Sequence, residues 1–140
     1  MTLSKNFTLA ELTHTDTGAV NVPNDEQRYK LLLIAQYLLQ PIRDKFGAVH
    51  VTSGFRSEFV HEAIKKVQNA PTSSTSQHLL GEAVDFIPEG DIDEVFEWCK
   101  ENLTFGQLIN ETHNGRKWLH ISLPRFEKAN QQVLLFNNGT

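Results

Sequence analysis

The sequence has 140 residues, of which 39% are hydrophobic and 21% are charged. This length and balance predict one globular domain over residues 1–140 and exclude wholesale disorder. A net charge of −4 argues against nucleic-acid binding, because phosphate recognition needs a clustered basic face. One cysteine excludes a disulfide framework, and no apolar run reaches the ~20 residues of a membrane span.

Two capping-box patterns predict the first helices. Thr8 and Glu11 mark a short helix within residues 7–12, and Asn24 and Gln27 mark the start of a second helix. In each pattern a short polar side chain precedes a Glu or Gln by three positions, so the two residues can satisfy the free N–H groups at a helix start. The second helix should be long, because apolar residues recur at spacings of three and four after its cap.

This long helix is expected to run to about Phe46 and to be distorted before its end. Pro41 lies inside the apolar pattern and lacks the N–H group that a helix needs, so it predicts a kink or a break. Gly47 predicts the end of the helix. The alternating, β-rich segment 49–52 then predicts a strand, and residues 53–56 predict a turn.

The second half of the sequence mixes helices with strands. Ser57 predicts the start of a helix that ends near residue 68, and the polar segment 69–77 predicts a loop. Residues 83–87 predict a strand. Asp91 predicts the cap of a further helix with one apolar face.

Asn-Gly at residues 114–115 is the strongest hairpin signal in the sequence. The flanking segments 105–111 and 117–123 are therefore expected to form antiparallel strands, and residues 133–136 predict a last strand. Mixed helices and strands with a late hairpin predict an α+β fold, in which several helices pack on a small antiparallel sheet.

Three residues have side chains suited to a metal ion. His78 lies at the end of the predicted loop, Asp85 follows seven residues later in a strand, and His120 lies in the second hairpin strand. Two imidazoles and one carboxylate suit a catalytic zinc ion whose fourth position is left to water. Spacing alone leaves an alternative open, in which the same residues are a loop histidine, a half-buried aspartate and a strand histidine.

Three motifs together resemble those of the M15 metallopeptidases, which cut peptidoglycan stem peptides. They are Ser-Gly-Phe-Arg-Ser at 53–57, Ser-x-His-x-x-Gly-x-Ala-x-Asp at 76–85, and Trp-x-His at 118–120. The resemblance extends over residues 7–135 and is greatest to the single-domain branch common in bacteriophages. It implies the M15 fold, which is similar to that of hedgehog proteins. It also implies carboxypeptidase, dipeptidase or endopeptidase activity on stem peptides.

The resemblance further implies roles for particular residues. It implies a Zn2+ ion bound by His78, Asp85 and His120. It implies that Arg56 binds a substrate carboxylate or stabilises the oxyanion, whereas the residues alone also allow a surface arginine at a helix start. Two further candidates for substrate binding are Ser53, which could instead bond local backbone, and Trp118, which could instead be a core aromatic.

One position departs from the family's pattern. Many members carry an acidic general base three residues before the last histidine, where this chain has Lys117. The predicted hairpin provides another carboxylate. A two-residue turn would place Glu111 and His120 on one sheet face, as diagonal neighbours at roughly 7–8 Å, and Lys117 on the opposite face. We therefore expect Glu111 to be the general base.

Two alternatives to this assignment remain open. A hairpin loop that is one residue longer or shorter would reverse the parity and turn Glu111 away from the site, as a solvated strand-end carboxylate. Glu82 is the second candidate for the base, although strand alternation places it opposite Asp85.

The expected function is that of a zinc peptidase acting on peptidoglycan in phage lysis or as part of a virion. The alternative is a catalytically silent, zinc-containing module that binds peptidoglycan but lacks a base because of Lys117. Residues 1–6 lack the apolar segment of a secretory signal. We therefore expect synthesis in the host cytoplasm, followed by action at the cell wall after release or by carriage in a virion. The expected partner is a stem peptide; we expect a monomer, no nucleic acid and no membrane insertion.

Overall fold

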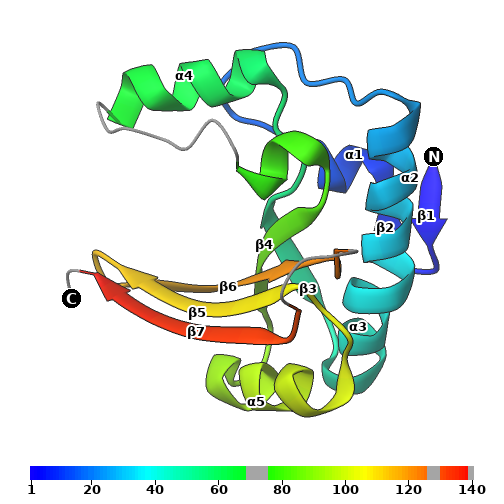
Figure 1. The fold of residues 1–140 in the computed structure, drawn as a ribbon, viewed down its shortest axis with the longest axis vertical. Coiled ribbons are helices and arrows are strands. Elements are labelled where there is room, and N and C mark those ends of the chain that lie inside the picture. Colours follow the sequence, from blue (N-terminus) through cyan, green and yellow to red (C-terminus); the bar gives the residue numbers. More distant parts are fainter. Residues whose placement is uncertain (69–75, 126–129, 139–140) are drawn as a thin grey trace.

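The computed structural model describes residues 1–68, 76–125 and 130–138, so most of the predicted loop over 69–77 lies outside the described residues. A five-stranded sheet in the order β3-β4-β6-β5-β7 forms the centre of the protein (Figure 1), and the predicted α+β class is confirmed. Its strands are β3 (Val49–Ser53), β4 (Ala83–Pro88), β5 (Gln107–His113), β6 (Arg116–Ser122) and β7 (Gln132–Asn138).

The sheet is mixed, whereas an antiparallel sheet was expected. Three strand pairs are antiparallel, but β7 pairs with β5 in parallel. The reason lies in the residues at the start of β7, which bond to the residues just before β5. There Gln131 N–H donates to Phe105 O at 2.9 Å and Gln132 N–H donates to Gly106 O at 3.0 Å. Because β7 starts beside the start of β5, it runs in the same direction.

The predicted hairpin register is confirmed. Asn114 and Gly115 both adopt positive φ angles, 51° and 77°, as a two-residue turn between twisted strands requires. Glu111 therefore pairs with Trp118 and Ile109 pairs with His120. This register decides which side chains of β5 and β6 share a face.

Both capping boxes form as predicted, at the starts of α1 (Leu9–Leu12) and α2 (Asp25–Ile34). The long helix continues from α2 through a π-helical segment, η1 (Ala35–Leu39), into α3 (Gln40–Phe46). Where Pro41 predicts a kink or a break, the helix instead widens into a π-helical turn and continues. Pro41 cannot donate a backbone hydrogen bond, and its ring crowds the preceding turn, so the helix widens just before it.

The remaining elements are short strands and three helical segments. An N-terminal hairpin of β1 (Thr2–Ser4) and β2 (Phe7–Thr8) is too short to give a sequence signal. The other elements are α4 (Glu58–Gln68), the 3-10 helix η2 (Gln77–Leu80) and α5 (Ile92–Asn102). Within residues 1–68, 76–125 and 130–138, no helix has the length and apolar character needed to cross a bilayer.

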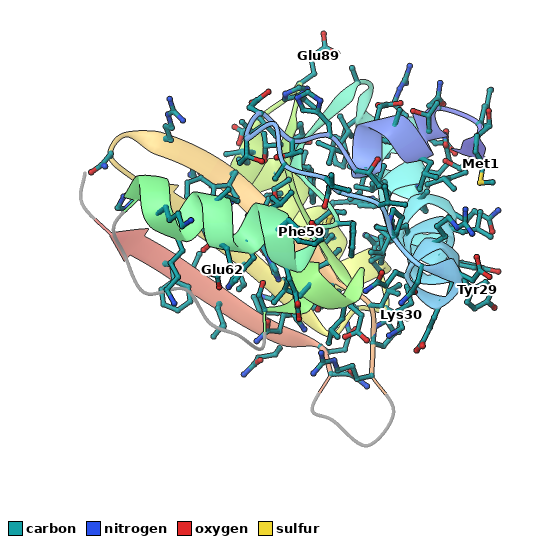
Figure 2. The ribbon with its side chains drawn as sticks, turned by 90° about the horizontal axis from the view of Figure 1, so that it is seen from above. Met1, Tyr29, Lys30, Phe59, Glu62 and Glu89 are labelled. Atoms are coloured by element: carbon teal, nitrogen blue, oxygen red, sulfur yellow. The ribbon has the colours of Figure 1, made fainter. Side chains whose placement is uncertain are left out.

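The two faces of the sheet have different neighbours. Helix α5 lies on one side of the sheet and α4 lies on the other (Figure 1). Figure 2 shows α4, which carries Phe59 and Glu62, lying over the sheet as seen from above. The face towards α5 carries the core, including Phe86, Leu108, Leu119 and Ile121, all fully buried. Because strand side chains alternate, the residues between these positions point to the α4 side, where they form the candidate site.

Candidate metal centre and active site

His78 is held in a fixed orientation before any ligand binds. It lies in η2, which Ser76 caps and which Gly81 ends in the left-handed conformation, with φ 72°. The His78 side chain is buried, and its Nδ1 lies 2.8 Å from the carbonyl oxygen of Gly54. A carbonyl only accepts, so Nδ1 carries the proton and Nε2 keeps a lone pair for a cation.

Asp85 and His120 are brought together by strand pairing. They are direct partners in the β4–β6 ladder, and Asp85 Oδ1 lies 2.9 Å from His120 Nδ1 and 3.4 Å from His78 Nε2. The ligand atoms of His78, Asp85 and His120 all lie within 4.8 Å of one another. Two nitrogens and one carboxylate at this separation fit a Zn2+ ion with one open position.

The electrostatics of Asp85 favour its ionised form. Burial alone would raise the pKa of this carboxyl, but the adjacent imidazoles of His78 and His120 outweigh burial and hold the pKa well below its usual range. Asp85 is therefore a carboxylate near neutral pH, which is the form that binds a cation. The cluster combines a carboxylate anion with two imidazole side chains.

Arg56 lies beside this cluster and is mostly buried, with 23% of its side chain exposed. Its Nη2 is 3.8 Å from Asp85 Oδ2, and its Nε donates to Ser53 Oγ at 2.9 Å. Its backbone N–H donates to the carbonyl of His78 at 3.0 Å. The guanidinium therefore keeps a fixed position at the pocket, and the hydroxyl of Ser53 helps to hold it by accepting the hydrogen bond from Nε.

Glu111 lies in the same pocket as the three candidate ligands. The pocket has a volume of about 560 Å³, and Trp118 in its wall donates through Nε1 to Glu111 Oε2 at 2.8 Å. Burial and then the charge of Asp85 raise the pKa of Glu111. A carboxylate with a raised pKa is a better general base near neutral pH. The lining residues are Arg56, Ser76, Gln77, His78, Asp85, Gln107, Ile109, Glu111, Trp118, His120 and Arg125.

Lys117 and Glu82 are both directed elsewhere. Lys117 Nζ pairs with the carboxylate of Asp93 on α5, so it lies on the opposite face, as the hairpin parity predicts. Glu82 accepts from Lys30 Nζ at 2.8 Å and from Arg125 Nε at 2.7 Å. Its carboxylate is thus held between two cations outside the pocket, whereas the carboxylate of Glu111 lines the pocket.

Sequence reasoning missed two groups that support the histidines. Gln77 Oε1 lies 3.1 Å from His120 Nε2, and the Gly54 carbonyl holds His78. A polar residue in a predicted loop gave no signal for Gln77. Gly54 did carry one, since it stands in the Ser-Gly-Phe-Arg-Ser motif; a Cβ there would lie 2.1 Å from Leu12 O.

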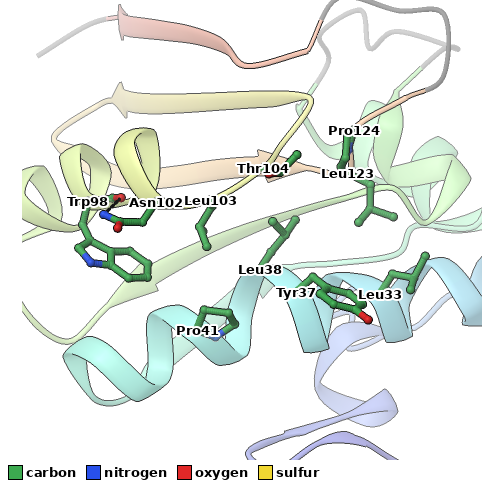
Figure 3. A pocket seen from close by; sticks show the side chains of 10 residues that line it. All are labelled: Leu33, Tyr37, Leu38, Pro41, Trp98, Asn102, Leu103, Thr104, Leu123 and Pro124. Atoms are coloured by element: carbon green, nitrogen blue, oxygen red, sulfur yellow. Dashed lines mark hydrogen bonds between the residues drawn. The ribbon is translucent and has the colours of Figure 1, made fainter.

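A larger cavity, of about 700 Å³, lies between η1, α3 and α5 (Figure 3). Its walls are mainly apolar, with Leu38, Trp98 and Leu103 pointing into it, and the ten described residues that line it include no carboxylate, histidine or cation. Volume alone therefore does not identify the site. The polar pocket around His78, Asp85 and His120 holds the groups that can do chemistry.

Comparison with known proteins agrees with this geometry. No curated protein matches the chain. The family model described as Peptidase M15 matches residues 5–122, a range that includes all three candidate ligands, Arg56 and Glu111. That range covers most of the chain, and the chain belongs to the M15 family of metallopeptidases.

Proposed function

We propose that this protein is a zinc-dependent peptidase that hydrolyses amide bonds in peptidoglycan stem peptides, as a phage lysis or virion-associated cell-wall enzyme. The observation that carries the proposal is the arrangement of His78, Asp85 and His120, with ligand atoms within 4.8 Å of one another. Glu111 and Arg56 line the same pocket. The cluster provides a metal site, a base and an anion-binding group.

The three ligands are suited to zinc chemistry. A zinc ion bound by them would polarise the scissile carbonyl and lower the pKa of a water molecule toward ~7. His78 presents Nε2 because Gly54 holds its Nδ1, and Asp85 contributes the negative charge. The partner groups fix these side chains before the substrate arrives, so little reorganisation is needed.

Glu111 is the proposed general base and acid. Its carboxylate accepts a proton from the attacking water and returns it to the nitrogen of the leaving amine. Trp118 fixes one carboxylate oxygen by its hydrogen bond at 2.8 Å. The raised pKa of Glu111 brings it closer to that of the groups between which it transfers the proton.

Arg56 is the proposed anchor for a negative charge on the substrate. Its planar fork can bind a carboxylate with two parallel hydrogen bonds or stabilise the oxyanion formed during attack. Ser53 holds only the Nε edge, at 2.9 Å. The pocket thus orients an anionic peptide relative to the metal ligands.

The alternative of a silent binding module depended on Lys117 replacing an acidic base. The pairing of Lys117 with Asp93 on the α5 side and the position of Glu111 in the pocket favour the enzyme instead. Both hypotheses require zinc, so turnover separates them. Purified protein should be incubated with zinc and isolated peptidoglycan, and the released fragments should be identified by mass spectrometry.

The peptidase hypothesis predicts new termini at one type of bond, and the fragment masses distinguish carboxypeptidase from endopeptidase cleavage. About one equivalent of zinc should copurify, and His78→Ala combined with His120→Ala should abolish its binding. Zinc binding and fragment binding without any cleavage would establish the silent module.

Matched variants test the base. Glu111→Gln keeps the size of the side chain and should retain zinc, but turnover should fall by roughly 10²–10⁴-fold. Lys117→Ala is the control on the opposite face and should change turnover by only a few-fold. Wild-type turnover by Glu111→Gln would exclude Glu111 as the base.

A further inference from the structure

The face of the sheet that carries the pocket continues beyond Glu111 onto the edge strand β7. In the parallel β5–β7 register, Ile109 pairs with Leu134 and Glu111 pairs with Phe136. Paired residues of neighbouring strands point to the same face. Leu134 and Phe136, which we call the β7 shelf, therefore lie on the same sheet face as the pocket residues Ile109 and Glu111, next to them on the edge strand.

Burial supports this parity. Val133, on the other face of β7, packs against the core. On the pocket face, Ile109 is buried, Leu134 is half-buried, and Phe136 is 53% exposed. The exposed fraction of the side chains thus rises from Ile109 in the pocket to Phe136 on the edge strand. The accessible ring of Phe136 belongs to the residue that pairs with Glu111, the proposed base.

We propose that the β7 shelf is a substrate subsite, in which Phe136 binds an apolar side chain of the stem peptide. The inference rests on the proposed function and specifies its substrate. Two strand spacings separate β6 from β7, so Phe136 lies roughly 10 Å across the sheet from the strand of His120. An extended peptide advances ~3.3 Å per residue, which places the bound side chain two or three residues from the scissile bond.

The two sides of the pocket differ in chemical character. Arg56 follows β3, which forms one edge of the sheet, and the β7 shelf lies at the other edge. The metal ligands lie between them, on β4, β6 and η2. A peptide that crosses the strands would therefore place a negative charge at Arg56 and an apolar group at Phe136. A cation at one edge of the sheet and an apolar surface at the other would orient the substrate, and would favour peptides long enough to reach both Arg56 and Phe136.

The test compares neighbouring positions on one strand. Phe136→Ser removes the ring from the pocket face, and Leu135→Ser removes an even more exposed side chain, 74% exposed, from the opposite face. KM and kcat are measured on synthetic stem peptides of increasing length. For the longest peptides, Phe136→Ser should raise KM about 5- to 10-fold with kcat unchanged. The shortest cleaved peptide and the Leu135→Ser variant should show wild-type values.

A binding experiment keeps this inference separate from the proposed activity. Zinc-loaded Glu111→Gln protein is titrated with the longest peptide by calorimetry, with and without Phe136→Ser. A 5- to 10-fold rise in Kd supports the shelf, even if wild-type protein proves inactive and the peptidase proposal fails. Equal effects of Phe136→Ser and Leu135→Ser on KM and Kd, or no peptide binding at all, would overturn the subsite.

Discussion

Gly54→Ala should show how tightly the metal site is coupled to the fold. A Cβ on Gly54 would lie 2.1 Å from the carbonyl oxygen of Leu12 and 2.8 Å from its carbonyl carbon. The same oxygen accepts the backbone N–H of Phe55 at 2.8 Å. Both sides of the clash belong to the backbone, so no side chain can rotate to relieve it. The substitution must separate the 53–56 turn from α1 by more than an ångström.

The expected cost follows from this geometry. Overpacking against backbone that cannot yield costs about 3 kcal/mol, and for a chain of this size that lowers Tm by about 10 °C. The displaced turn also carries the carbonyl that holds His78 Nδ1. Loss of such a supporting hydrogen bond lowers metal affinity by about 10- to 100-fold. Gly54→Ala should therefore weaken both stability and zinc binding.

Urea unfolding of metal-free protein measures the first effect, and zinc competition against a chelator measures the second. Gly90→Ala is the control, since a Cβ at Gly90 meets no atom within 4 Å, and its stability should remain within about 0.5 kcal/mol of wild type. A Gly54→Ala protein with wild-type stability and zinc affinity would refute the coupling.

Two further substitutions test the charged groups around the pocket. Arg56→Lys keeps the charge but loses the planar fork, so kcat/KM on stem peptides should fall by at least 10-fold while zinc content stays at one equivalent; an unchanged kcat/KM would remove Arg56 from substrate binding. Burial tends to raise the pKa of Glu82, but hydrogen bonds from Lys30 and Arg125 lower it overall. The lowered folded-state pKa stabilises the protein above the unfolded value of ~4.3, and this contribution is lost as pH falls through the folded-state pKa. Glu82→Gln should therefore be less stable than wild type by about 1 kcal/mol at pH 7 and by much less at pH 3; a pH-independent difference in urea unfolding would contradict this.

Features set by local chemistry could be predicted from the sequence. The capping boxes at Thr8 and Asn24 depend only on residues three positions apart, and both form. The Asn-Gly turn at 114–115 fixes the hairpin loop length, and with it the parity of every residue on both strands. That parity brought Glu111 and His120 to one face.

Features set by long-range contacts could not be predicted in this way. The parallel pairing of β7 depends on bonds from Gln131 and Gln132 to residues about 26 positions earlier, which no local pattern records. The support of His78 by the Gly54 carbonyl joins residues 24 positions apart in sequence. The side chain of Arg56 is mostly buried, and its backbone N–H donates to the carbonyl of His78, 22 positions later, whereas its local sequence is equally compatible with a surface arginine.

The parity of β6 also explains how this chain can have a lysine where many M15 peptidases have an acid. Pairing between β5 and β6 is regular from Leu108–Ile121 to His113–Arg116, without a bulge. In such a strand, positions three apart point to opposite faces. A carboxylate at position 117 would therefore face α5, where Lys117 meets Asp93. On β6 the position that shares the face of His120 is held by Trp118, and the carboxylate on this face comes from its pairing partner on β5, Glu111.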